Sequence, residues 1–215
     1  MTLELDTETA ENLPRLHDPN CLIFIRHGQT DWNAEGRMQG QKDIPLNETG
    51  REQARGNGRR LKAFFENHGC SVNQFRFVAS PMDRTRETMA LVRENMDLDP
   101  SGYELDDQLR ELTFGSWEGS TIPELAEVVP DLVEERRRDK WAFVPPGGGE
   151  SYAMLSERIG KWLVTVDRPT VVVAHGGVFR AVNGLLQGLP KRDVPRLDVP
   201  QDRVFLWQDT SMSWI

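Results

Sequence analysis

Short apolar runs recur along the chain, and the distance between successive runs is long enough for a helix. Residues 21–26, 75–79 and 170–174 are mostly apolar, which is typical of strands buried on both faces of a parallel sheet. A weaker strand is predicted at 103–109, and a last one at 203–208. The chain is therefore predicted to form a central sheet of short strands.

The stretches between these runs have helical spacing of their apolar residues. Helices are predicted at 47–67, 82–96, 121–141 with a break at Pro130, from Ser151 onward, and from Gly177 to about Gln187. Asn47 suits the cap of the first of them, although Gly56 and Gly58 lower its helix propensity. Strands that alternate with helices predict an α/β fold, a three-layer α/β/α sandwich with a mostly parallel central sheet. Ligands of such sheets bind beyond the carboxyl ends of the strands.

Length and composition indicate one folded domain. The chain has 215 residues, of which 38% are hydrophobic and 28% charged, and the domain is predicted to span 21–215. Residues 1–20 are acidic, contain two prolines, and are predicted to form a separate N-terminal tail. Neither a signal peptide nor an apolar stretch of membrane-spanning length is found, so a cytoplasmic location is expected. Two cysteines, Cys21 and Cys70, are too few for a disulfide framework.

The net charge restricts the partners. A formal charge of −8 disfavours binding along nucleic acid or to an acidic membrane surface. We expect a small phosphorylated metabolite as substrate, which would need a local cationic pocket. The sequence leaves the oligomeric state open between a monomer and a homodimer.

Four predicted strand ends carry residues suited to one chemistry. They are Arg26-His27-Gly28, Ser80-Pro81 followed by Arg84, Arg110-Glu111, and His175-Gly176-Gly177. Because parallel strands end at the same edge of a sheet, these groups are expected to lie close together. Arginine binds phosphate bidentately, a neutral histidine nitrogen is a nucleophile, and a carboxylic acid can protonate a leaving alkoxide. The combination favours phosphoryl transfer.

Further donors complete this predicted pocket. The amide of Asn33 and a backbone N–H of Gly176 could bind phosphoryl oxygens where a helix begins. With two arginines and a second histidine present, neither a metal ion nor another cofactor is expected.

The same residues resemble a known family. "IRHGQTDWN" with "RMQG", "DIPLNETGREQA", "SPMDRTRET", "LRELTFGSWEG", "PPGGGES" and "VVVAHGG" are similar, in this order, to motifs of the histidine phosphatase superfamily, also called the phosphoglycerate mutase-like family. The resemblance covers roughly 21–185. It implies a phosphoglycerate mutase-like fold and a histidine phosphatase that hydrolyses phosphomonoesters without metal.

The resemblance also implies individual roles. His27 would be phosphorylated, Glu111 rather than the nearby Glu118 would be the proton donor, and four further residues would hold the phosphoryl group. Those four are Arg26, Asn33, Arg84 and His175.

Several alternatives to these roles exist. Arg84 could instead form a surface ion pair with Asp83 or Glu87, and His175 could cap the following helix. Cys70 and Arg76 have the Cys-x5-Arg spacing of cysteine phosphatases, but no glycine-rich loop joins them and the strand follows instead of preceding the cysteine. A zinc hydrolase would need a ligand spacing such as His-x3-His, and the sequence has none. A non-catalytic phospho-ligand domain is the most distant alternative.

A phosphoglycerate mutase is the main rival to a phosphatase, because one pocket can serve both reactions. The basic run 136–140 could supply the extra cations that a mutase needs. The loop "ELTFGSWEGS", however, lacks the Glu-Arg-His-Tyr run of the cofactor-dependent mutases, and "GRMQGQKDIPLN" resembles the phosphatase branches. Hydrolysis is therefore predicted.

Overall fold

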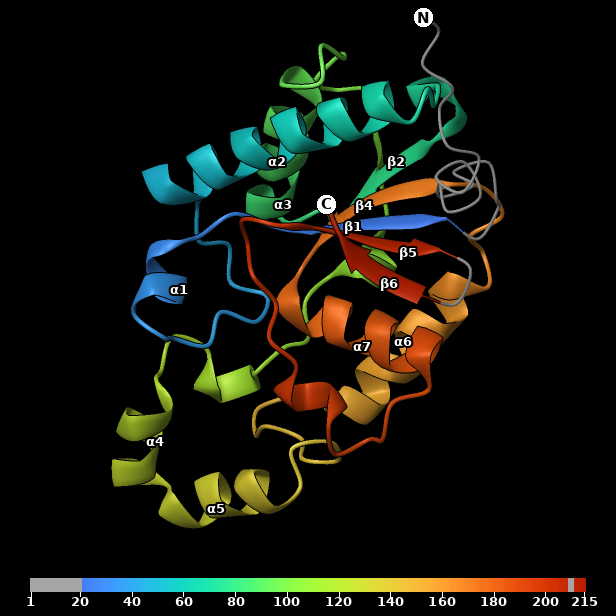
Figure 1. The fold of residues 1–215 in the computed structure, drawn as a ribbon. Coiled ribbons are helices and arrows are strands. Elements are labelled where there is room, and N and C mark those ends of the chain that lie inside the picture. The colour runs from blue at the N-terminus through green and yellow to red at the C-terminus, as the bar shows by residue number, and fades with distance from the viewer. Residues whose placement is uncertain (1–20, 209–210) are drawn as a thin grey trace, which may run out of the picture.

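The computed structural model describes residues 21–208 and 211–215. The predicted tail, 1–20, lies outside the described residues. The described chain forms a central sheet with helices on both faces, as Figure 1 shows. The predicted three-layer α/β/α sandwich is confirmed.

The sheet has six strands in the order β3-β2-β4-β1-β5-β6. They are β1 Leu22–Arg26, β2 Arg76–Ala79, β3 Glu104–Leu105, β4 Thr170–Ala174, β5 Val204–Gln208 and β6 Ser211–Trp214. Strands β3, β2, β4 and β1 are parallel, whereas β5 pairs antiparallel with β1 and β6 antiparallel with β5. The sheet is thus mostly parallel with an antiparallel edge.

Seven α-helices connect or flank these strands in the described part of the chain. They are α1 Asp31–Ala34, α2 Glu48–Asn67, α3 Asp83–Glu94, α4 Ile122–Val128, α5 Pro130–Arg138, α6 Tyr152–Leu163 and α7 Gly176–Gln187. Asn47 caps α2 as predicted, since its side chain accepts a hydrogen bond from Gly50 N. Pro130 separates α4 from α5, which confirms the predicted break.

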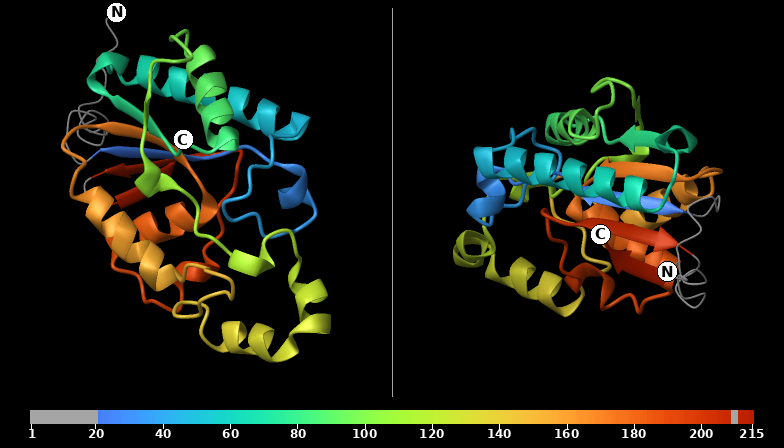
Figure 2. Two further views of the ribbon diagram at one scale, coloured as in Figure 1. Left: turned by 180° about the vertical axis from the view of Figure 1, so that it is seen from behind. Right: turned by 45° about the horizontal axis from the view of Figure 1, so that its top comes forward.

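Alternate residues of β1 enter two cores. Leu22 and Phe24 pack in the cluster under α6 and α7, whereas Ile23 and Ile25 pack in the cluster under α2 and α3. Each fully buried aliphatic side chain contributes about 1.5–3 kcal/mol. Figure 2 shows the two helical layers on opposite faces of the sheet. A strand buried on both faces is held rigidly, and so is the segment that follows it.

Helix α2 lies against α3 at a glycine. A Cβ atom on Gly58 would lie only 2.5 Å from the carbonyl oxygen of Val92 in α3. Gly58 therefore does not oppose the helix; it permits the two backbones to approach. This close contact fixes α3, which carries Arg84, against the sheet.

A third, smaller core lies away from the sheet. Met38, Trp117, Leu125 and Phe143 form it, with partly buried residues of α4 and α5 packed against them. Figure 1 shows α4 and α5 projecting beyond the two helical layers. These helices form a lobe next to the carboxyl ends of the strands, and the lobe has its own apolar support.

One sequence prediction needs correction, and three features of the fold were not predicted. The strand predicted at 103–109 covers only Glu104–Leu105, because Asp106 caps a 3-10 helix at Asp107–Leu109 through Gln108 N. The last predicted strand is antiparallel to β1, and the edge strand β6 and the short helix α1 were not predicted. Both missed elements are four residues long, too short for a clear hydrophobic period.

Candidate active site

Neighbouring strands place two histidines together. Arg26 and Ala174 are partners in the parallel ladder of β1 and β4, and His27 N donates to Ala174 O at 2.9 Å. The next residue on each strand is a histidine, and the His27 and His175 rings lie 5.2 Å apart between centroids. The strand ends therefore meet at one edge of the sheet as the sequence predicted.

The imidazole of His27 presents a free lone pair. Its Nδ1 lies 2.8 Å from Gly28 O, and a carbonyl oxygen only accepts, so Nδ1 carries the proton and Nε2 does not. The ring is buried. Burial, then the charges of Arg84 and Arg26, hold the pKa of His27 well below its usual value. His27 is consequently a neutral, oriented nitrogen base at physiological pH.

Arg84 lies inside the protein and not at its surface. Its side chain is 1% exposed, and its two terminal nitrogens donate to Lys42 O at 2.7 Å and Gly40 O at 2.8 Å. Neither surface ion pair considered from the sequence is formed, because Asp83 pairs with Arg86 and Glu87 pairs with Arg51. The nearest carboxylate oxygen to Arg84 is that of Asp43, 3.9 Å from Nη1. Burial lowers the pKa of Arg84, yet a guanidinium stays charged.

Arg26 supplies a second, half-buried cation from the end of β1. Its Nη1 donates to Val199 O at 2.6 Å. Burial and, secondarily, the charge of Arg180 lower the pKa of Arg26 to about 10, so it is charged at pH 7. Within the described residues, Nε of Arg26 and Nε of Arg84 are buried without a hydrogen-bond partner. An anion between them would satisfy both donors.

His175 also keeps one ring nitrogen without a partner. Its Nε2 lies 2.8 Å from Ser80 Oγ, whereas its buried Nδ1 bonds to no described residue. The side chain does not cap α7, which removes the capping alternative. Burial followed by the charge of Arg84 holds the pKa of His175 well below its usual value. Gly176 begins α7, whose N-terminus therefore faces this edge.

The two glutamates of the segment 109–119, Glu111 and Glu118, make different contacts. Glu111 Oε2 accepts from Gly177 N at 3.0 Å, at the start of α7, and its Oε1 accepts from Leu112 N at 3.0 Å. Glu118 instead binds the backbone of Gln41 and Phe114 and the hydroxyl of Thr113, all through Oε1. Glu111 is therefore the carboxylate at the start of α7, the helix that His175 precedes, and Glu118 holds loops together.

The side-chain oxygen of Asn33 takes part in local hydrogen bonds, whereas its side-chain nitrogen does not. Its Oδ1 accepts from Thr30 N in the capping box of α1 and from Gln201 Nε2 at 3.0 Å. The amide Nδ2 makes no hydrogen bond to the described residues and can donate to a phosphoryl oxygen. The predicted donor group is thus available.

Two supporting residues were not predicted. Gln201 Nε2 also donates to His27 O at 3.0 Å, so a loop before β5 holds the residue that follows β1. Arg158 on α6 pairs with Glu150 and donates to the backbone carbonyls of Gln108 and Arg110, just ahead of Glu111. No motif marks either residue, because each acts from a segment remote in sequence.

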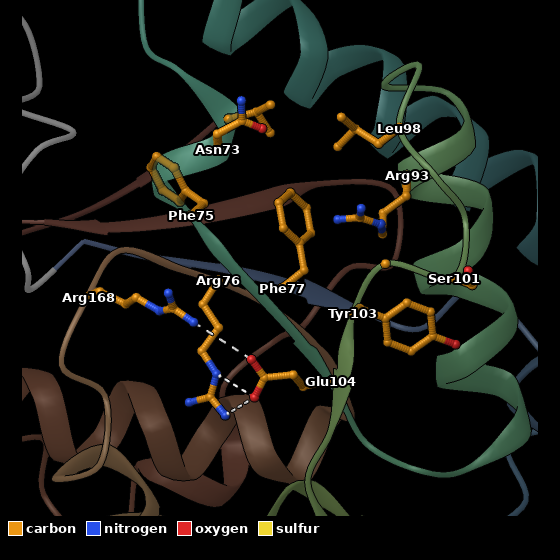
Figure 3. Close-up of a pocket in the computed structure, with 12 residues that line it drawn as sticks. Asn73, Phe75, Arg76, Phe77, Arg93, Leu98, Ser101, Tyr103, Glu104 and Arg168 are labelled. Carbon is orange, nitrogen blue, oxygen red and sulfur yellow. Dashed lines mark hydrogen bonds and ion pairs between the residues drawn. The ribbon is translucent and has the colours of Figure 1, made fainter.

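A separate hollow of about 460 Å³ opens at the amino ends of β2 and β3. Figure 3 shows its charged side chains paired with one another: Arg76 and Arg168 both meet Glu104. Arg93 lies over the ring of Phe77 and donates to Asp99 O. With its cations already engaged, this hollow lacks the free donors found at the carboxyl ends.

Metal-ligand clusters and membrane spans were also sought in the described residues. No group of three or more His, Cys, Asp or Glu side chains in residues 21–208 and 211–215 could hold a metal ion. None of the helices in this part of the chain is long and apolar enough to cross a membrane.

Comparison with known proteins identifies the family. The profile of the histidine phosphatase superfamily (branch 1) matches residues 22–207. The chain belongs to this superfamily. The predicted family is confirmed on nearly the whole described chain.

Individual relatives agree with this class. The glucosyl-3-phosphoglycerate phosphatase of Mycolicibacterium vanbaalenii is 34% identical over 82% of this chain and 78% of its own length. A probable phosphoglycerate mutase of Cronobacter sakazakii is 33% identical over 79% and 75%. A mycobacterial glucosyl-3-phosphoglycerate phosphatase solved with VO3 has a TM-score of 0.71 and 30% identity, over 91% of this chain and 96% of that one. The predicted class, a phosphoric monoester hydrolase, is confirmed.

Proposed function

We propose that this chain hydrolyses phosphomonoesters of small metabolites through a phosphohistidine on His27, without metal. The observation that carries the proposal is the free Nε2 lone pair of the buried His27, whose ring is kept neutral by burial and by the charges of Arg84 and Arg26. A neutral nitrogen is nucleophilic, and adjacent cations stabilise the charge of the transferred phosphoryl group.

Substrate binding would use the donors that lack protein partners. The Nε atoms of Arg26 and Arg84 and the Nδ1 of His175 are such donors or potential donors in the described residues. The amide of Asn33 and the backbone N–H of Gly176 add further contacts. These groups would grip the three peripheral oxygens, which is the main requirement for phosphoryl transfer.

In the first chemical step, His27 Nε2 forms a bond to phosphorus as the bond to the leaving oxygen breaks. Glu111, in its acid form, gives its proton to that oxygen, which departs as an alcohol. The proton on Nδ1 remains on the ring, and Gly28 O stabilises the positive charge that develops there.

In the second step, water attacks phosphorus and the P–N bond breaks. Glu111, now a carboxylate, takes a proton from the water. Inorganic phosphate leaves and His27 returns to its neutral form. Glu111 acts first as acid and then as base, and the cycle needs no other proton carrier.

A mutase is the second candidate, favoured by the relatives named as probable phosphoglycerate mutases and by the cations of α5. In a mutase the phosphohistidine must return its phosphoryl group to a reoriented intermediate and exclude water. We expect 3-phosphoglycerate, primed with 2,3-bisphosphoglycerate, to yield far less 2-phosphoglycerate than phosphate. Isomer formation that far outruns phosphate release would favour the mutase and keep the same catalytic residues.

The proposal is tested by phosphate release from a panel of sugar phosphates, phosphoglycerates, nucleotides and phosphoamino acids. Activity should persist in excess chelator, be inhibited competitively by vanadate, and disappear in His27→Ala. The matched control is Cys70→Ser, which should be nearly silent because the Cys70 thiol is half-buried in the packing beside α2. Activity lost on chelation and restored by a divalent ion, or lost in Cys70→Ser, would overturn the proposal.

A further inference from the structure

Three cations lie just beyond the phosphoryl pocket and are not needed by the chemistry above. Arg136 lies on α5, Lys140 follows α5, and Arg180 lies on α7; we call them the outer basic cluster. All three side chains are half-buried. The buried Tyr152, the first residue of α6, lies among them.

Arg180 connects this cluster to the phosphoryl pocket. A Cβ atom built on Gly176 would lie 3.4 Å from Nη1 of Arg180 and 3.4 Å from Nε of Arg26. The two guanidinium groups therefore flank the same glycine at the start of α7. Arg180 is held there by its bond to Leu197 O at 2.8 Å and its contact with the Tyr152 hydroxyl at 3.4 Å.

Lys140 and Arg136 approach from the lobe. Lys140 Nζ donates to Pro195 O at 2.7 Å and lies 5.9 Å from the centre of the Tyr152 ring. Burial, and after it the charges of Arg136, Arg180 and Arg196, lower the pKa of Lys140 to about 8. Burial also lowers the pKa of Arg136, with a smaller contribution from Arg180. The three members of the cluster therefore lie close enough for their charges to repel one another.

The two arginines that follow Arg136 on α5 differ from the cluster in exposure and in ion pairing. Arg137 and Arg138 are exposed and both pair with Glu134. No carboxylate of the described residues forms an ion pair with any member of the outer basic cluster. Half-buried like charges without a counter-ion raise the free energy of the free protein, and a bound anion would remove that cost.

We propose that the outer basic cluster binds a second anionic group of the substrate. The substrate would then be a compact phosphomonoester with a carboxylate or a second phosphate only a few bonds from the scissile phosphate, since Arg180 and Arg26 flank one glycine. Arg180 can form a bidentate contact, Lys140 adds a point charge, and the hydroxyl of Tyr152 can donate. The cluster would thus select substrates that carry a second anionic group. This inference rests on the proposed function, which places the scissile phosphate at His27.

Two substrate pairs test the inference. 3-Phosphoglycerate and glycerol 3-phosphate differ by a carboxylate in place of a neutral hydroxymethyl group. Propanediol bisphosphate and propanediol monophosphate test a second phosphate in the same way. We expect kcat/KM to be about tenfold to hundredfold higher for the doubly anionic member of at least one pair, as for a hydrogen bond between charged groups. The pair that shows the preference identifies the anion.

Variants assign the preference to residues. Arg180→Gln and Lys140→Gln should each remove most of the preference, through KM more than kcat, and leave glycerol 3-phosphate almost unchanged. Arg137→Gln is the matched control, since this arginine lies three residues before Lys140 but is exposed and paired with Glu134. This variant should leave kcat/KM unchanged for both members of each substrate pair.

Binding to the His27→Ala protein keeps the test independent of turnover. By calorimetry, the ligand with two anionic groups should bind at least about tenfold more tightly than its partner with the phosphate alone, and Arg180→Gln should remove that difference. Equal affinities within both pairs, or an equal loss for both members in Arg180→Gln, would overturn the inference. If binding discriminates but no phosphomonoester is hydrolysed, the proposed function fails and the second anion site stands.

Discussion

Replacing Glu111 by glutamine tests which glutamate donates the proton. We expect Glu111→Gln to lower kcat/KM for glycerol 3-phosphate by about 10²- to 10⁴-fold, the usual contribution of general acid catalysis. This corresponds to about 2.7–5.4 kcal/mol of transition-state free energy. The ratio kcat/KM reports on steps up to leaving-group departure, so the later role of Glu111 toward water does not enter.

The leaving group gives the assay its specificity. p-Nitrophenolate departs without a proton, whereas the alkoxide of glycerol does not. With p-nitrophenyl phosphate, kcat/KM of Glu111→Gln should therefore fall by less than about tenfold. The two substrates share every phosphoryl contact, so a difference between them isolates proton donation.

Contacts around the two carboxylates predict the stability of the variants. Glu111 accepts from Gly177 N and Leu112 N on separate oxygens, and an amide can keep only one of these bonds. The backbone N–H left without a partner costs about 1–3 kcal/mol, which a folded domain tolerates. Glu118 takes its three bonds on Oε1, so the amide oxygen of Glu118→Gln can keep all of them.

Glu118→Gln is consequently the matched control, with near-normal kcat/KM on both substrates. The reasoning would be refuted by an equal loss on both substrates in Glu111→Gln. A selective loss on glycerol 3-phosphate in Glu118→Gln would refute it as well, and would exchange the roles of the two residues.

Further predictions follow from individual contacts. Arg84→Gln should lower kcat/KM by about 10²- to 10³-fold in steady-state assays, as for one oxyanion donor. Arg158→Met leaves Glu150, 14% exposed, without its partner and should lower the unfolding free energy by about 2 kcal/mol in urea titrations. A lowered pKa favours the neutral form, so 15N NMR of His27 should show an uncharged ring protonated on Nδ1 at pH 6; titration near 6.5 would contradict this. Because Lys140 loses its charge above about pH 8, the preference for 3-phosphoglycerate should be present at pH 7 and decline by pH 9.

The central part of the site could be predicted from the sequence because its position follows from the sheet. Parallel strands β1 and β4 end at the same edge, so Arg26-His27 and His175-Gly176 had to meet once the strands were recognised. Arg84 lies in the first turn of α3, soon after the end of β2, and the same rule places it. Short local patterns were sufficient for these residues.

The acid was harder to place from sequence. The strand before Glu111 covers only two residues, and a 3-10 helix follows it, so strand periodicity alone does not bring the carboxylate to α7. The resemblance to the family selected Glu111 over Glu118, and the contacts of each carboxylate give the physical reason.

Long-range support could not be predicted. Gln201 reaches the backbone of His27 from 174 residues away, and Arg180 meets Arg26 only because α7 begins beside β1. Such contacts depend on the path of a loop or the rotation of a helix, which hydrophobic patterns do not determine. The contacts of Lys140 and Arg180 with Tyr152, which bring α7 and the segment after α5 to the start of α6, are long-range in the same way.

Trapping the phosphoenzyme tests the central claim most directly. The protein is mixed with 32P-labelled substrate, quenched within milliseconds in denaturant at alkaline pH, and digested for mass spectrometry. We expect acid-labile, base-stable phosphate on the peptide that contains His27, and none in His27→Ala. A burst of product with no label on the protein, or label on Cys70 in place of His27, would contradict it.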